Sequence, residues 1–142
     1  MSTEENKKLV TRFYEEIDKG NLDAMDEFVA EHYIDHAPPP FPGFAPGREG
    51  LKQAFRLFWE ATPGTHKIED QIAEGDKVAT RFTVRMTHRA TGVLVTLTAI
   101  AIAQLLDGQL VAYWDEADML GLLRQVGALP APGPPSERLG WG

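Results

Sequence analysis

Residues 106–129 have the sequence LDGQLVAYWDEADMLGLLRQVGAL. Asp107-Gly108 is a turn signal, and the mixed apolar and polar residues 110–117 that follow indicate a β-strand. Asp118 stands where this strand ends and a short apolar helix over residues 119–126 begins. The segment therefore predicts a hairpin whose second strand leads directly into a helix.

Before this turn, three strands are predicted at residues 67–74, 78–88 and 93–106, and the last of them is the first strand of the hairpin. They are rich in Val, Ile, Thr and Phe, and turn signals separate them. Because residues 93–106 are almost entirely apolar, we expect both faces of that strand to be covered. Apolar residues three and four apart predict helices at residues 3–19 and 22–30. Helices followed by antiparallel strands are typical of an α+β fold in which the helices cover one face of the sheet.

A third helix is predicted around residues 51–59. Before it, residues 32–37 favour an extended chain, and residues 38–47 form a Pro- and Gly-rich loop that carries Phe41 and Phe44. Aromatic side chains are unusual in a plain linker. We therefore expect the loop to fold back over a pocket and its phenylalanines to contact a ligand.

The chain has 142 residues, which suits one domain, placed at residues 1–129 with a flexible Pro- and Gly-rich tail at residues 130–142. Its net charge of −7 argues against nucleic-acid or anionic-membrane partners, because phosphates would repel it. The absence of cysteine excludes disulfides and thiolate chemistry. No signal peptide or transmembrane segment is evident, so we expect a soluble, cytoplasmic protein.

A three-residue turn at residues 107–109 predicts the register of the hairpin. The expected pairs are Leu106 with Leu110, Gln104 with Ala112, and Ile102 with Trp114. In this register Gln104, Ile102 and Trp114 share a face with Asp118, and we expect that face to line the ligand site. A two-residue turn would shift the register and could reverse the faces.

Asp118 has two interpretations. Asp is a favoured N-cap, and that alone would explain its position before a helix. Alternatively, Asp115, Glu116 and Asp118 gather three carboxylates beside Trp114, and burial would raise the pKa of one of them toward the range useful for moving protons. We predict that Asp118 projects into an apolar hollow and is the catalytic carboxylate.

His36 and His88 are the other candidate catalytic residues, because each ends a predicted strand near the expected pocket. A histidine that only makes a structural hydrogen bond is the alternative for both. His32 and His36 would lie ~13 Å apart in a strand, at ~3.3 Å per residue, which is too far to share a metal ion. We therefore expect no metal site.

Tyr14 and Trp59 are predicted to contact the ligand from the first and third helices, with core packing as the alternative. His66, at a loop edge, is expected to be solvated. Arg81 and Arg85 are expected to point away from the pocket, toward solvent or a subunit contact.

Three segments carry a resemblance to a known family: residues 106–129, VTRFYEEIDKGNLDAMDEFVAEHYIDHAP at residues 10–38, and VATRFTVRMTHRATG at residues 78–92. They resemble the SnoaL-like polyketide cyclase (ester cyclase) family of the nuclear transport factor 2-like superfamily, over roughly residues 5–129. The resemblance implies a cone-shaped, cystatin-like α+β barrel. Three to four helices would pack on a curved antiparallel sheet around a pocket, and the outer face of the sheet would form a homodimer.

By position, Asp118 matches the family's catalytic acid/base, His36 and His88 match polar residues of its cavity, and Gln104 falls where characterised cyclases have histidine. The resemblance implies cofactor-independent aldol-type cyclisation or isomerisation of a hydrophobic carbonyl compound, in which Asp118 removes a proton next to the carbonyl. Two alternatives remain open. One is a non-catalytic module that binds a hydrophobic ligand, and the other is epoxide hydrolysis, which needs an Arg–Asp pair inside the pocket.

Overall fold

The computed structural model describes residues 2–37 and 43–129. Part of the predicted aromatic loop, with Phe41, and the predicted tail at residues 130–142 lie outside the described residues. No helix in the described part of the chain is long and apolar enough to cross a membrane.

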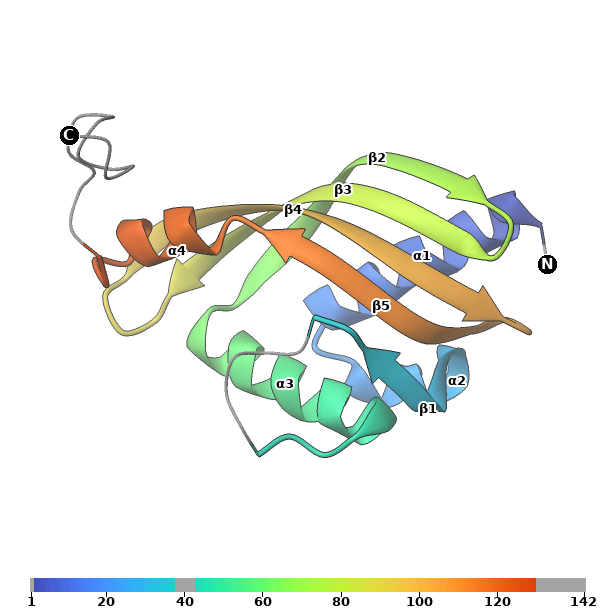
Figure 1. The fold of residues 1–142 in the computed structure, drawn as a ribbon. Coiled ribbons are helices and arrows are strands. Elements are labelled where there is room, and N and C mark those ends of the chain that lie inside the picture. The colour runs from blue at the N-terminus through green and yellow to red at the C-terminus, as the bar shows by residue number, and fades with distance from the viewer. Residues whose placement is uncertain (1, 38–42, 130–142) are drawn as a thin grey trace, which may run out of the picture.

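The described chain forms one five-stranded sheet with helices against one side (Figure 1). The helices are α1 (Thr3–Asp18), the 3₁₀ turn η1 (Leu22–Ala24), α2 (Met25–Phe28), α3 (Gly47–Ala61) and α4 (Met119–Gln125). The strands are β1 (Val29–Asp35), β2 (Gly64–Glu74), β3 (Lys77–His88), β4 (Val93–Leu106) and β5 (Gln109–Ala117). The strand order is β1-β5-β4-β3-β2, and only the β1–β5 pair is parallel. The predicted α+β class is confirmed.

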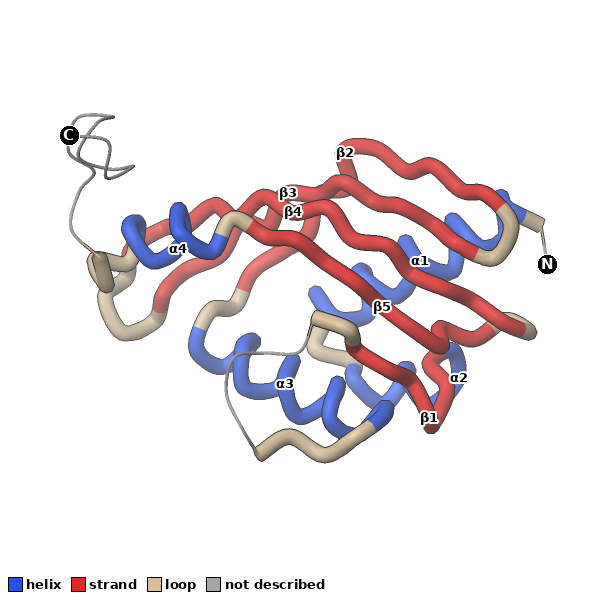
Figure 2. The backbone as a smooth tube through the Cα atoms, viewed as in Figure 1, coloured by secondary structure: helices blue, strands red, loops and turns tan. Residues whose placement is uncertain are grey.

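Helix α1 forms where the sequence predicts it. Ser2 caps its first turn by accepting a hydrogen bond of 3.1 Å from the backbone N–H of Glu5. Val10, Phe13 and Ile17 recur at helical spacing and are buried on the side that packs on β2 and β3. We call the sheet face toward α1, α2 and α3 the inner face. Figure 2 shows these helices on one side of the sheet, with α3 running beside β1.

The helices cover the inner face unevenly. On β3, the inner-facing side chains of Val78, Thr80 and Phe82 are buried, whereas Val84 and Met86, toward the β3–β4 turn, are only half-buried. On β5, Tyr113, Asp115 and Ala117 are likewise half-buried. We call this region, inner-facing residues 84–86 of β3 and 113–117 of β5, the open half of the inner face. Solvent or a ligand reaches it.

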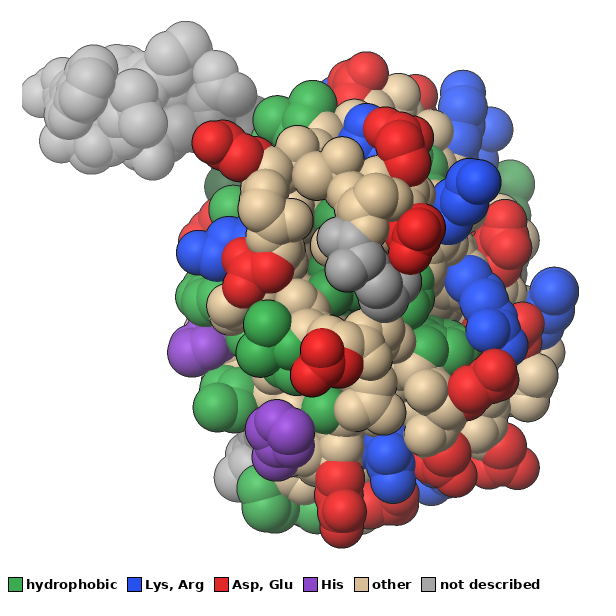
Figure 3. Space-filling view, turned by 90° about the vertical axis from the view of Figure 1, so that its right-hand side faces the viewer, with side chains coloured by type: hydrophobic (Ala, Val, Ile, Leu, Met, Phe, Trp, Pro, Cys, Tyr) green, Lys and Arg blue, Asp and Glu red, His purple; other side chains and the backbone are tan. Residues whose placement is uncertain are grey.

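The outer face of the sheet is exposed, which corrects the expectation that both faces of β4 are covered. Ile100 and Ile102 are 54% and 41% exposed, because no helix within residues 2–37 and 43–129 packs against their side of the sheet. Ile102 lies in one row with Ile72, Ala79 and Trp114 across four strands. Figure 3 looks at the side of the molecule that is on the right in Figure 1, where hydrophobic side chains reach the surface beside histidines and acidic and basic side chains mix over much of the rest.

The β4–β5 hairpin combines a shorter turn than predicted with a compensating bulge. The turn has two residues, Asp107 and Gly108, with φ of 50° and 76°, as in the turns that match the twist of paired strands. Leu106 therefore pairs with Gln109 and not with Leu110. A bulge at residue 111 restores the predicted pairs Gln104 with Ala112 and Ile102 with Trp114. It also allows both Leu110 and Tyr113 to face inward.

Candidate functional site

The structure corrects the predicted placement of the Asp118 side chain. Its side chain is exposed and caps helix α4, where Oδ1 accepts a hydrogen bond of 3.0 Å from the backbone N–H of Gly121. A Cβ on Gly121 would lie 2.2 Å from Asp118 Oδ2, so glycine leaves room for this cap. Asp118 does not project into a hollow. Its position is explained by the demands of the helix N-terminus.

The end of the same motif also has a structural explanation. The side-chain amide of Gln125 accepts a hydrogen bond of 2.9 Å from the backbone N–H of Thr96 and donates one of 2.8 Å to its C=O. Thr96 lies on β4 beyond the point where β5 ends, so Gln125 satisfies backbone groups that a neighbouring strand would otherwise pair. Asp118 and Gln125 together hold α4 along the edge of β4.

Four other predicted site residues lie on the outer face. His36 is exposed, and its ring stacks on Trp114 with centroids 4.4 Å apart. Lys77 Nζ lies 5.7 Å from the Trp114 ring centroid. Gln104 donates a hydrogen bond of 2.9 Å to Asp76, and Ile102 is exposed. The prediction that Gln104, Ile102 and Trp114 share a face is confirmed, but this face is turned away from the helices, and His36 stacks on that side too.

The remaining predicted residues are dispersed. His88 faces inward at the end of β3, where its Nδ1 lies 2.8 Å from the Thr91 hydroxyl in the adjoining turn. Phe44 is half-buried in the segment before α3. Tyr14 is 2% exposed and belongs to the core, yet its hydroxyl takes part in the polar cluster described below. The structure therefore does not bring the predicted Asp118, His36 and His88 together.

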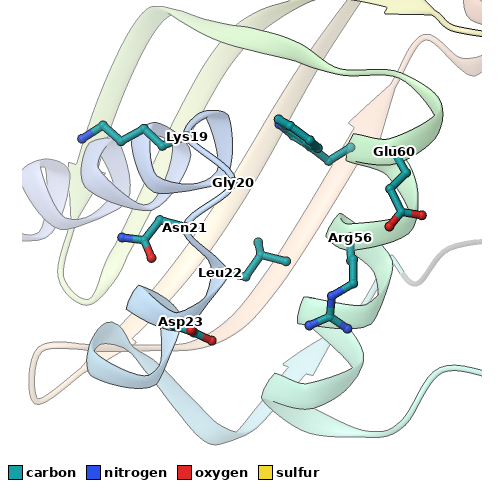
Figure 4. Close-up of a pocket in the computed structure, with 8 residues that line it drawn as sticks. Lys19, Gly20, Asn21, Leu22, Asp23, Arg56 and Glu60 are labelled. Carbon is teal, nitrogen blue, oxygen red and sulfur yellow. The ribbon is translucent and has the colours of Figure 1, made fainter.

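A surface groove of about 420 Å³ lies between the end of α1 and helix α3 (Figure 4). It is lined by Lys19, Gly20, Asn21, Leu22, Asp23, Arg56, Trp59 and Glu60. Trp59 is 40% exposed here, with Arg89 5.9 Å from its ring centroid. The lining of the groove has two basic and two acidic side chains and none of the predicted catalytic residues. The groove therefore has no group that points to acid/base chemistry.

The carboxylate that does face the helices is Asp115. It pairs with the buried Ala101 of β4, and its side chain lies half-buried in the open half of the inner face. Loss of solvation raises the pKa of Asp115 to about 6, and the negative charges of Asp35 and Glu116 add to the rise. Burial also raises the pKa of Asp35 at the end of β1. Asp115 therefore changes its charge near neutral pH, as a proton-transfer group must.

The charge of this carboxylate acts on three tyrosine hydroxyls, those of Tyr14, Tyr33 and Tyr113. The Tyr14 and Tyr113 hydroxyl oxygens lie 2.7 Å apart and share one hydrogen bond. The Tyr33 hydroxyl is buried and has no partner in the described part of the chain. Burial is the main cause that raises the pKa of all three tyrosines, and the charge of Asp115 raises them further. At the pH values near neutral at which the Asp115 carboxylate can accept a proton, the three tyrosines are still protonated and can donate hydrogen bonds.

A second polar pair lies beside this cluster. His66 Nδ1 is 2.6 Å from Asp18 Oδ1, and the backbone N–H of His66 donates a hydrogen bond of 2.8 Å to Asp18 Oδ2. The His66 ring stacks on Tyr14 with centroids 5.0 Å apart. His66 is 13% exposed, so the expectation of a solvated histidine is wrong. No group of three or more potential metal ligands occurs within residues 2–37 and 43–129.

The comparison with protein families agrees with this architecture. The model of the SnoaL-like polyketide cyclase family matches residues 8–126, most of the chain. The chain belongs to this family. The comparison with curated protein sequences gives no match.

Three solved structures have a similar fold. TsrD from Streptomyces laurentii is 27% identical, covers 91% of this chain and 99% of its own, and superposes with a TM-score of 0.80. A predicted polyketide cyclase from Bacillus cereus ATCC 10987 is 32% identical, covers 89% of this chain and 83% of its own, and gives a TM-score of 0.79. IdmH from Streptomyces antibioticus, also a predicted polyketide cyclase, is 26% identical. It covers 86% of this chain and 98% of its own, and gives a TM-score of 0.75. The likeness to these three structures therefore extends over most of the chain.

Proposed function

We propose that this SnoaL-like protein is a cofactor-independent acid/base enzyme that cyclises or isomerises a hydrophobic carbonyl compound. The observation that carries the proposal is the inward-facing Asp115. Its carboxyl group has a pKa of about 6, and its charge acts on a cluster of protonated tyrosines. The family name supports the cyclisation class. Asp115 takes the catalytic role that the sequence assigned to Asp118.

In this reaction, the Asp115 carboxylate removes a proton from the carbon next to a carbonyl group. The C–H electron pair moves into the new C=C bond, and negative charge develops on the carbonyl oxygen. The Tyr14–Tyr113 pair shares only one of its two hydroxyl hydrogens internally, so the other is free to donate to this oxygen. In a cyclisation, the enolate carbon attacks a second carbonyl, and protonated Asp115 gives its proton to the alkoxide that forms. In an isomerisation, it gives the proton to a different carbon of a conjugated enolate, so that the C=C bond moves.

A simple probe tests whether the site removes protons from carbon. In 5-nitrobenzisoxazole, a base takes the C–H proton while the N–O bond breaks, and a coloured cyanophenolate forms. We expect the protein to accelerate this opening above the rate in acetate of equal concentration, with an activity that rises with pH through about 6. A rate equal to that of acetate would refute the enzyme and favour a binding module.

The epoxide hydrolase alternative has less support. It requires an arginine beside the inner carboxylate, but Arg81 lies on the outer face, where its Nη2 is 2.6 Å from Asp70. Arg85 is also exposed. The binding-module alternative keeps the same open half but needs no titrating group there. No specific observation favours the binding module over the enzyme.

We also infer that the protein forms a homodimer through the outer face. The row of Ile72, Ala79, Ile102 and Trp114 presents apolar side chains without cover, with Ile72 71% exposed. Sedimentation velocity should give twice the mass of one chain, and Ile72→Glu should give a monomer, because the partner would bury the charge. A monomeric wild-type protein at micromolar concentration would contradict the dimer.

A further inference from the structure

The Asp18–His66 pair is fixed more firmly than a surface contact requires. Both oxygens of Asp18 are used, one by the His66 ring and one by the His66 backbone. The ring also contacts two aromatic neighbours that contact each other, with its centroid 5.0 Å from that of Tyr14 and 5.4 Å from that of Phe82. Asp18 ends helix α1 and His66 lies near the start of β2, so the imidazole has one defined orientation.

This arrangement determines which ring nitrogen carries the proton in the neutral imidazole. A carboxylate only accepts hydrogen bonds, so Nδ1 of His66 carries the hydrogen and Nε2 keeps a lone pair. Nε2 has no hydrogen-bond partner in the described part of the chain. Three side-chain atoms there are both buried and without a partner, and Nε2 is not one of them, so solvent reaches it. Nε2 is therefore not fully buried and is free to accept a hydrogen bond.

We propose that His66 Nε2 accepts a hydrogen bond from a hydroxyl group of the ligand, and that Asp18 is the positioning residue that holds the hydrogen of the neutral imidazole on Nδ1. The inference deepens the proposed function and rests on it for the reaction at the ligand's carbonyl. Tyr14 joins the two locations, because its ring contacts His66 while its hydroxyl contacts Tyr113 in the Asp115 cluster. The ligand would then carry its hydroxyl at a distance from its reacting carbonyl.

A purely structural role for the pair predicts something different. If Asp18 only ties the end of α1 to β2, loss of its charge would change stability without changing which ligands bind. Asp18→Asn separates the two roles. The Asn oxygen can still accept from the His66 backbone, but its NH₂ must donate to Nδ1, which moves the ring proton to Nε2 and abolishes the acceptor.

The test uses two fluorescent probes, 6-hydroxy-2-acetonaphthone and its methyl ether, which differ only in the hydroxyl hydrogen. At pH 8, wild-type protein should bind the hydroxyl probe about tenfold more tightly than the ether. Asp18→Asn should reduce this preference to about twofold or less. Asp70→Asn is the matched control, because Asp70 is an exposed β2 carboxylate on the outer face, and it should keep the wild-type preference.

Nitrogen-15 NMR of the His66 imidazole supplies a second readout. The ring should carry its proton on Nδ1 in the wild-type protein and on Nε2 in Asp18→Asn. Equal affinity for the two probes in wild type, binding of neither, an unprotonated Nδ1 in wild type, or an undiminished preference in Asp18→Asn would each overturn the proposal. Asp115→Asn should keep the hydroxyl preference, so failure of the proposed proton abstraction is distinguishable from failure at His66.

Discussion

Replacing Asp115 with Asn is expected to slow the opening of 5-nitrobenzisoxazole by about 10²-fold to 10⁴-fold, the range typical of a positioned general base. Asn has nearly the same size and shape as Asp, so the open half of the inner face keeps its form while the proton acceptor is lost. Initial rates of cyanophenolate formation at pH 8, where Asp115 is ionised, measure the effect.

Asp118→Asn is the matched control for this experiment. It removes the same charge three residues along the chain, and Asn caps a helix about as well as Asp, so both rate and stability should remain close to wild type. Asp118→Ala should instead cost about 1 kcal/mol of folding free energy through loss of the cap, still without slowing the probe reaction. The account is contradicted if Asp118→Asn is the slow variant and Asp115→Asn is not.

Asp115→Asn is also expected to stabilise the protein at pH 8. The pKa of Asp115 rises from its ordinary 3.8 to about 6 in the folded protein, so ionisation opposes folding. A shift of this size corresponds to about 3 kcal/mol, and partial exposure of the side chain reduces the expected gain to about 1–2 kcal/mol. Urea unfolding of both proteins gives the difference.

The difference in unfolding free energy between Asp115→Asn and the wild type should depend on pH, and its direction follows from the raised pKa. Below about pH 4, Asp115 is protonated in both folded and unfolded states, so the wild type pays no cost of ionisation. The cost develops as pH rises from about 4 to above 6, and the advantage of Asp115→Asn should grow over the same range. An advantage that stays constant from pH 4 to pH 8 would show that the Asp115 carboxyl is not desolvated.

The sequence predicts the elements of this fold better than it predicts their faces. Helical spacing and turn residues place every helix and strand within a few residues. On β4, however, apolar residues occupy both faces, and only their size differs. Small alanines such as Ala99 and Ala101 face inward, where Phe13 and Tyr14 need room, while the larger Ile100 and Ile102 face outward. Polarity alone could not reveal this assignment.

The error about Asp118 has the same origin. The predicted register was right for Trp114 and its partners, but the face it defined was taken to be the inner one. Successive side chains of a strand point to opposite faces, so Asp115 lies on the face opposite Trp114. Placing Ala99 and Ala101 on the inner face would therefore have identified Asp115 as the inward-facing carboxylate. His66 was beyond sequence reasoning, because its partner Asp18 is 48 residues away and meets it only through the packing of α1 on β2.

The central claim is that Asp115 is an inward-facing carboxyl whose proton leaves near neutral pH. Carbon-13 NMR of the aspartate side chains, with Asp115→Asn used to assign the signal, follows that proton directly. The account predicts a titration midpoint of about 6 for Asp115. A midpoint near 4, the value of a solvated aspartate, would contradict it.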